Sequence, residues 1–313
     1  MVDLLGYDFL QRALVAAAIV GLVAPMVGVF LVQRRLALIG DGIGHVALAG
    51  VAVGLLTNQA PVLTALIAAA AAAVVVEVIR SRGRTGGDTA LAIIFYGGIA
   101  AGVALISASP KGSPANLTSY LFGAITTVSS ADLVTFAVLG LAVATVVTVL
   151  WSALFAAAQD EEYARAAGLP VLTLNLVLGV LVAVTVVVAM RVVGLLLISA
   201  LMVVPNATGQ VLGRSFAGAA RWAVLIGVLS AVGGVLLSYQ VDTPSGATIV
   251  LLAVAVYVVA ALGARFSAPV SPGDTLRTEV YRHGDTGTAG FRVRAGDDPD
   301  ARVVLDRGVI ELR

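Results

Sequence analysis

Apolar runs separated by short polar segments fill most of this chain up to residue 264. Several of them reach or exceed the roughly 20 residues that a helix needs to cross a lipid bilayer. Such runs predict helices, because a closed barrel would show alternating polar and apolar positions instead. The chain is therefore predicted to be an all-α membrane protein, a polytopic bundle of eight or nine transmembrane helices. The nine candidate spans are residues 10–32, 42–57, 61–79, 89–107, 131–156, 171–190, 192–212, 222–238 and 246–264.

Basic residues fall in alternate connections between these spans. Cytoplasmic loops carry an excess of Lys and Arg, so these connections are expected inside, with the amino terminus outside and the carboxyl-terminal tail inside. A further span hidden in residues 108–130 would reverse the side of everything after it. Lys111 and Arg191 depart from the alternation. The residues that follow it are Arg34, Arg35, Arg80, Arg82, Arg84, Arg165, Arg214, Arg221 and Arg265.

Composition supports a membrane protein and excludes several kinds of site. Hydrophobic residues make up 59% of the chain and charged residues only 12%, about half the share in a soluble domain. The net charge of +1 gives no reason to expect a nucleic-acid partner. There are no cysteines, so disulfides, thiolate metal sites and cysteine nucleophiles are excluded.

Charge is concentrated near the end of the chain. Residues 267–313 hold 15 of the 37 formally charged side chains, which divides the chain into a transmembrane domain, 1–266, and a polar cytoplasmic tail, 267–313. The alternating segments FRVR and RVVLDRGVIEL could form a small hairpin sheet. The Gly, Asp and Arg content of the tail favours a flexible extension instead.

One carboxylate and one imidazole lie at the start of the second apolar run. Asp41 and His45 are four residues apart, which on a helix places their side chains on one face, about 5–6 Å apart at Cβ. Ionisable groups at membrane depth are costly and mark transport paths, and this pair can bind a divalent cation. Two ligands are too few for zinc or manganese, so others must come from other helices, water or a second subunit. Alternatively, Asp41 caps the helix and His45 is a hydrogen-bonded core residue.

The segment AQDEEYARAAGLP interrupts two apolar runs on the predicted cytoplasmic side. Its acidic residues favour the start of a helix, and Gly168 and Pro170 favour its end. The segment predicts a short protruding helix to which a soluble partner protein can bind. A solvated interfacial turn is the alternative.

Three further polar positions lie in or near the spans. Arg191 either lines an aqueous path or extends to the lipid headgroups, and the second is favoured because it marks a span boundary. Pro205 with Asn206 is expected to interrupt the seventh span, either as the wall of a cavity or as an ordinary proline kink. Glu77 and Arg80 are expected to form a surface ion pair.

Motifs for nucleotide binding and hydrolysis are missing from the sequence. There is no GxxxxGK[ST] phosphate loop, and neither GxSxG nor HExxH occurs. No enzymatic activity is therefore expected of this chain. If it uses ATP energy, another polypeptide must bind the nucleotide.

Six segments carry a family resemblance: VGVFLVQRRLALIGDGIGHVALAGVAVG (27–54), DTALAIIFYGGIAAGVALIS (88–107), YLFGAITTVSSADL (120–133), DEEYARAAGLPV (160–171), VVVAMRVVGLLLISALMVVPNATG (186–209) and DTPSGATIVLLA (242–253). In this order they resemble the permease subunits of zinc, manganese and iron ABC importers. Any one segment is weak, but six in series, covering most of residues 12–265, are specific.

The resemblance implies a homodimer in a bacterial plasma membrane, two cytoplasmic ATP-binding subunits and an extracytoplasmic metal-binding protein. Asp41 and His45 match the acid and the histidine that line the family's metal path. Arg191 matches the arginine of the family's MRVVG segment, whose role stays open. The residues that match the coupling helix, which docks on the ATPase, are Asp160, Glu161, Glu162, Tyr163, Ala164, Arg165 and Gly168.

The predicted function is that of the permease subunit of an ATP-driven importer, which passes the ion inward by alternating access at the homodimer interface. Zinc, manganese or ferrous iron is the cargo, since oxygen and nitrogen ligands disfavour cuprous copper, and no permanent cofactor is expected. The alternative is a proton-coupled secondary metal transporter that uses Asp41 and His45 without an ATPase partner. A non-transporting membrane scaffold is the weaker alternative.

Overall fold

The computed structural model describes residues 7–81, 87–107, 120–123, 128–195 and 197–265, together with strands at 276–283, 288–295 and 302–311. Three basic residues that were used to predict the membrane orientation lie outside these ranges: Arg82, Arg84 and Lys111. The chain forms two compact units, Met1–Tyr257 and Val258–Arg313, so the boundary lies within the last helix, slightly before residue 266.

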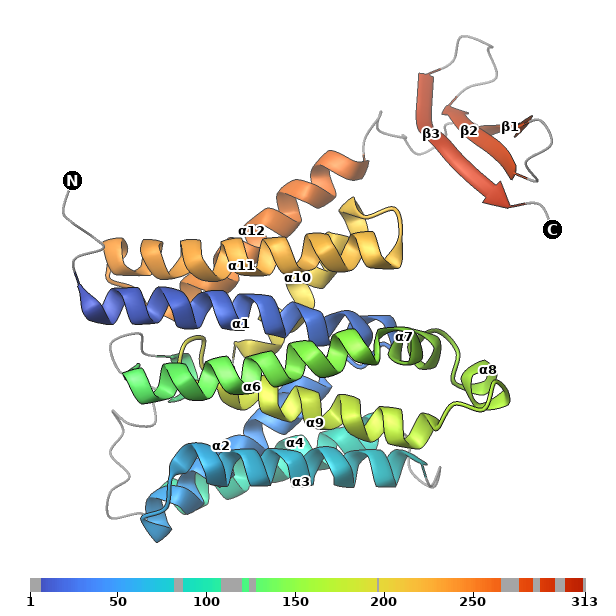
Figure 1. Ribbon diagram of the computed structural model, residues 1–313. Coiled ribbons are helices and arrows are strands. Elements are labelled where there is room, and N and C mark those ends of the chain that lie inside the picture. The colour runs from blue at the N-terminus through green and yellow to red at the C-terminus, as the bar shows by residue number, and fades with distance from the viewer. Residues whose placement is uncertain are drawn as a thin grey trace. The chain divides into compact units, whose positions relative to one another are not determined.

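Most described residues of the apolar runs are helical (Figure 1). Seven of the described helices are long and apolar enough to cross a membrane, and two shorter apolar segments, Leu91–Ser107 and Ile198–Leu212, account for the other expected spans. The predicted polytopic helical bundle is therefore confirmed. The helices are α1 (Asp8–Gln33), α2 (Ile39–Thr57), α3 (Pro61–Ser81), α4 (Gly87–Ser107), α6 (Ser130–Val149), α7 (Trp151–Gln159), α8 (Glu161–Ala166), α9 (Val171–Ala189), α10 (Ile198–Leu212), α11 (Phe216–Val241) and α12 (Ser245–Arg265).

The seventh expected span starts later than predicted, and the predicted interruption at Pro205 is wrong. The described residues of 190–197 form turns, and α10 then continues through Pro205 to Leu212. Gly194 has a φ of 89°, a left-handed value that glycine adopts without steric cost. Within α10, the side-chain amide of Asn206 donates to the carbonyl of Met202 at 2.7 Å. This bond lies next to the proline, and α10 continues past it.

The helix ends fall into two sets at opposite ends of the bundle (Figure 1). At one end Arg34, which follows α1, pairs with Glu161 at the start of α8. At the other end Arg191, which follows α9, pairs with Asp132 in the first turn of α6. α4 begins at the first end and ends at the second, where α6 also begins. The sides of the later loops are therefore not reversed, and the alternation of the basic connections is kept.

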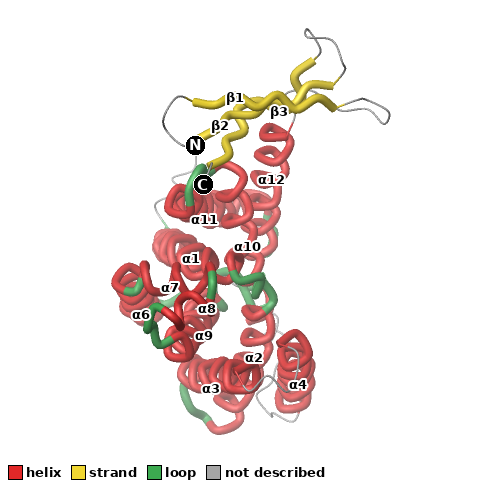
Figure 2. The backbone as a smooth tube through the Cα atoms, turned by 90° about the vertical axis from the view of Figure 1, so that its right-hand side faces the viewer, coloured by secondary structure: helices red, strands yellow, loops and turns green. Residues whose placement is uncertain are grey.

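α1 lies in the interior of the bundle, against α6, α9, α10 and α11 (Figure 2). Two of these contacts depend on glycine. A Cβ at Gly21 would lie 2.6 Å from the carbonyl oxygen of Gly227 on α11, and a Cβ at Gly28 would lie 2.7 Å from Nδ2 of Asn206 on α10. Close approach of helix backbones provides contact energy where no aqueous hydrophobic effect operates.

In the second unit, three strands form an antiparallel sheet in the order β1-β2-β3. The strands are β1 (Leu276–His283), β2 (Thr288–Ala295) and β3 (Arg302–Glu311). FRVR lies in β2, and RVVLDRGVIEL covers β3. These residues therefore form a small sheet, as the alternating segments of the sequence suggest, and the second unit contains this sheet.

Candidate functional site

Asp41 and His45 lie in the first two turns of α2, and both are partly exposed. The glycines between and beside them are buried, and Gly40 packs closely against Ser199 of α10. The glycine face of α2 thus lies against the rest of the bundle. This leaves the carboxylate and the imidazole on the more open part of the helix.

The capping alternative for Asp41 is wrong. α2 begins at Ile39, its N-cap residue is Leu38, and no side chain caps it. Asp41 lies within the first turn, where the helix macrodipole favours a carboxylate. Among the residues that the structure describes, neither Asp41 nor His45 has a hydrogen bond or ion pair to another side chain. His45 is therefore not the hydrogen-bonded core residue of that alternative.

Asp41 lines an apolar cavity between α2 and α4 with a volume of about 280 Å³. The ring of Phe95 meets the ring of His45 edge-on, with centroids 4.6 Å apart and planes at 83°. The described part of the chain holds no group of three or more His, Cys, Asp or Glu side chains that could bind a metal. Among these residues the pair is thus open and short of ligands. The cavity is lined by Leu38, Asp41, Leu91, Ala92, Phe95 and Tyr96.

The short helix α8 has one inward face and one outward face. Asp160 caps it, because its Oδ1 accepts from the backbone N–H groups of Glu162 at 2.9 Å and Tyr163 at 3.0 Å. Ala164 is fully buried, whereas Tyr163 is 68% exposed. Gly168 ends the segment with a φ of 82°. The predicted protruding helix is present. Its exposed residues are Glu162, Tyr163, Arg165 and Ala166, and Ala167 and Gly168, which follow it, are exposed too.

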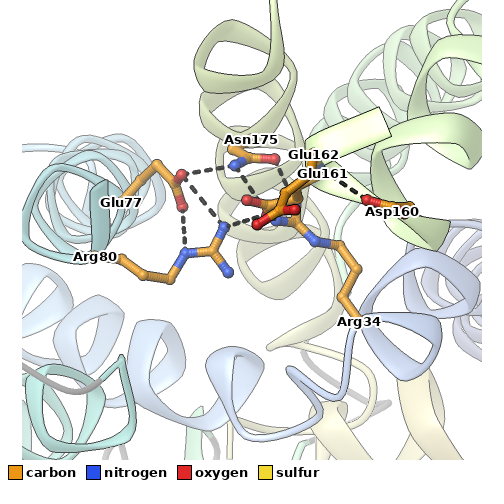
Figure 3. Close-up of polar contacts among 7 residues, drawn as sticks. All are labelled: Arg34, Glu77, Arg80, Asp160, Glu161, Glu162 and Asn175. Atoms are coloured by element: carbon orange, nitrogen blue, oxygen red, sulfur yellow. Dashed lines mark hydrogen bonds and ion pairs between the residues drawn. The ribbon is translucent and has the colours of Figure 1, made fainter. Parts of the chain in front are cut away.

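Glu161, at the start of α8, is the centre of a polar network that joins four elements (Figure 3). Its Oε1 pairs with Arg34, accepts from Nη2 of Arg80 at 3.1 Å and lies 3.4 Å from Nδ2 of Asn175. Asn175 also accepts from Nη1 of Arg34 at 2.6 Å and donates to Glu77 at 2.8 Å. Beside the network lies a cavity of about 450 Å³. The network therefore connects the ends of α1 and α3 to the starts of α8 and α9.

Burial changes the character of two charges in this network. Glu77 is only 7% exposed, so the predicted surface pair with Arg80 is a largely buried one, with Nε and Oε2 3.1 Å apart. Burial, followed by the charge of Arg80, lowers the pKa of Arg34 to about 10, while Glu77 acts in the opposite direction. Arg34 is still protonated at neutral pH.

Arg191 forms an ion pair at the opposite end of the bundle. Its Nη1 lies 2.5 Å from Oδ2 of Asp132, and its guanidinium lies 5.9 Å from the centroid of the Tyr120 ring. Asp132 also completes a capping box with Ser129. Arg191 thus fixes the turn after α9 to the start of α6, a contact that neither prediction for it included.

Pro205 and Asn206 lie in the interior of one protomer. Asn206 is 1% exposed, and its Nδ2 donates to the carbonyl oxygen of Pro25 on α1 at 3.0 Å as well as to Met202 on α10. Its Oδ1 has no hydrogen-bond partner among the residues that the structure describes. These contacts support a role in joining α10 to α1 and favour the ordinary proline-containing helix over a cavity wall.

Sequence reasoning missed the network because its members are far apart along the chain. Arg34 was recognised only as an orientation signal, and Glu161 only as part of the coupling segment. Arg80 was recognised as an orientation signal and as the partner of Glu77. Asn175 carries the one signal that was available, since it is the single carboxamide in the apolar run 171–190. A buried amide in such a run needs hydrogen-bond partners.

Known proteins resemble this chain over nearly all of the membrane part. Residues 6–264 match the ABC 3 transport family. The manganese transport system membrane protein MntC of Halalkalibacterium halodurans is 32% identical over 258 residues, which are 82% of this chain and 88% of that protein. The high-affinity zinc uptake system membrane protein ZnuB of Haemophilus influenzae is 27% identical over 252 residues, 80% and 96% of the two chains. The solved structure of PsaBC from Streptococcus pneumoniae in complex with Fab has a TM-score of 0.75 at 30% identity, covering 85% of this chain and 94% of that one.

Proposed function

The chain belongs to the ABC 3 transport family and is a multi-pass bacterial membrane protein, and from this premise we propose that it is the permease subunit of an ATP-driven importer of divalent transition-metal ions. Its relatives are named as membrane proteins of manganese and zinc transport systems. The membrane part has the helices that such a subunit needs. ATP hydrolysis takes place in a separate subunit.

The observation that carries the proposal is the pair Asp41 and His45. Both side chains are free of hydrogen bonds to other described residues, and Asp41 opens into the cavity between α2 and α4. A carboxylate and an imidazole suit zinc, manganese or ferrous iron. Because the pair provides only part of a coordination shell, it binds an ion briefly and releases it, as a transport path requires.

The remaining parts of the importer follow the family pattern. Two copies of the chain form a homodimer around the ion path, and an extracytoplasmic metal-binding protein delivers the ion. The exposed face of α8, with Tyr163 and Arg165, docks on the cytoplasmic ATP-binding subunit. ATP binding there drives alternating access.

ATP dependence separates this proposal from a proton-coupled transporter. We expect proteoliposomes that contain the permease, its ATP-binding subunits and the delivery protein to take up Mn²⁺ or Zn²⁺ only when ATP is supplied to the ATPase side. A proton gradient without ATP should give no uptake above empty vesicles. Uptake driven by the gradient alone, or uptake by permease without ATP-binding subunits, would contradict the proposal.

A further inference from the structure

One carboxylate oxygen holds α8 to the helices around it. Oε1 of Glu161 meets donors from three other places in the fold: Arg34 after α1, Arg80 in the last turn of α3 and Asn175 in the first turns of α9 (Figure 3). Besides this, α8 contributes the buried Ala164 to the core. Among the described residues, the polar attachment of α8 to α1 and α3 thus depends on a single side chain.

The partners of Glu161 are more buried than Glu161 itself, whose side chain is 37% exposed, so breaking the attachment would leave charge in the interior. The side chain of Arg34 is only 6% exposed, and that of Glu77 is 9% exposed. If Glu161 moved away, two guanidinium groups would share the one carboxylate of Glu77. An uncompensated buried charge is strongly unfavourable, so α8 and the end of α1 are held together when either one moves.

A short hydrogen-bonded turn joins Arg34 to α2, the helix that carries Asp41 and His45. Within the turn, the N–H of Leu36 donates to Leu31 at 2.8 Å, and the N–H of Ile39 donates to Leu36 at 3.1 Å. α2 begins at Ile39, and Asp41 lies in its first turn. A displacement of Arg34 is therefore passed to Asp41 through the six residues between them, which form this hydrogen-bonded turn and the start of α2.

We propose that Glu161 is a positioning residue that makes α8, the end of α1 and the start of α2 move as one body. The inference rests on the proposed function: the ATP-binding subunit moves α8, and Glu161 passes that movement through Arg34 to Asp41 and His45. The outer face of α8 then serves for docking, whereas its inner carboxylate serves for transmission. Loss of the Glu161 carboxylate should therefore uncouple the movement of α8 from the movement of Asp41 and His45.

The first test measures metal ions transported per ATP hydrolysed by the reconstituted complex. Glu161→Gln keeps the shape of the side chain but cannot balance Arg34 and Arg80, so we expect the ratio to fall about tenfold while ATP hydrolysis continues. Glu161→Asp, which keeps the charge, should restore most of the ratio. Asp242→Asn is the charge-matched control, since Asp242 is exposed at the other end of the bundle with a φ of 54° that asparagine also adopts. An unchanged ratio in Glu161→Gln would overturn the inference.

The second test does not depend on the stability of a Glu161 variant. Nε2 of Gln33, the last residue of α1, lies 2.7 Å from Oε1 of Gln159, which directly precedes Asp160. Since the chain has no cysteine, a short bismaleimide can join Gln33→Cys to Gln159→Cys selectively. If α8 and the end of α1 move as one body, the cross-linked complex should transport at close to the rate of the same variant before cross-linking. Loss of transport on cross-linking would overturn the inference.

The two proposals fail in different ways. If the wild-type complex shows no ATP-driven uptake at all, the proposed function fails. If the wild type is active but Glu161→Gln keeps its ratio, or cross-linking stops transport, only the inference fails.

Discussion

Replacing Asp41 and His45 together by alanine should abolish metal uptake, lowering the rate at least about 100-fold. Losing even an indirect partner of a metal ligand costs about 10–100-fold in affinity, and here both direct ligands of the path would be lost. Neither side chain has a hydrogen bond or ion pair to another described residue, so the fold should not depend on them. The measurement is ATP-driven uptake of Mn²⁺ or Zn²⁺ into proteoliposomes, together with the unfolding temperature and the retention of the ATP-binding subunits.

The matched control is Asp8→Ala, which removes an exposed carboxylate from the first turn of α1. We expect it to keep wild-type uptake. Normal uptake by the double variant would show that Asp41 and His45 do not contact the ion. Lost uptake together with a lower unfolding temperature would show instead that the pair supports the fold.

Gly28→Val should unfold the protein more than any other change considered, by about 3 kcal/mol or more. The position has no room for a side chain, because an added Cβ would overlap the carbonyl of Met202 and lie 2.7 Å from Nδ2 of Asn206. The two helices would have to separate, and Asn206 would lose its bond to Pro25. The measurement is thermal unfolding of the purified permease in detergent, followed by tryptophan fluorescence.

Gly97→Ala is the matched control for this prediction. Gly97 is exposed on α4, and an added Cβ there has no atom within 4 Å. Alanine in a helix is more favourable than glycine by about 1 kcal/mol, so this variant should be as stable as the wild type or slightly more so. A Gly28→Val protein with wild-type stability would show that α1 and α10 are not packed as described.

Hydropathy predicts the membrane bundle well because the cost of an unsatisfied backbone in lipid leaves helices as the usual solution. Hydropathy wrongly predicts a helix where the backbone N–H and C=O groups of an apolar segment have hydrogen-bond partners outside a helix. The turns around Arg191 are such a case, since the N–H of Leu195 donates to the carbonyl of Tyr120 at 2.9 Å and Ser245 donates to Val192 at 2.9 Å. These partners are distant in sequence, and so the late start of α10 could not be predicted.

The candidate site shows the same division between local and distant information. Asp41 and His45 were found because their spacing on one helix is a local pattern. The capping role of Asp160 is local too, and it is observed. In contrast, the contacts of Glu161 with Arg34 and Asn175 join residues 127 and 14 positions apart. Charge alone predicts that such residues need partners, but only the fold determines which partners they have.

The most direct test of the account asks whether His45 faces a water-filled path that admits a metal ion. Because the chain has no cysteine, His45→Cys carries a single thiol per subunit, at a position where sulfur can still bind zinc. In the assembled complex we expect this thiol to react with a membrane-impermeant methanethiosulfonate and Zn²⁺ to slow the reaction. Ile67→Cys, on the exposed apolar surface of α3, should stay unreactive. A His45→Cys thiol that is as unreactive as the one at position 67, or whose reaction Zn²⁺ does not change, would contradict the account.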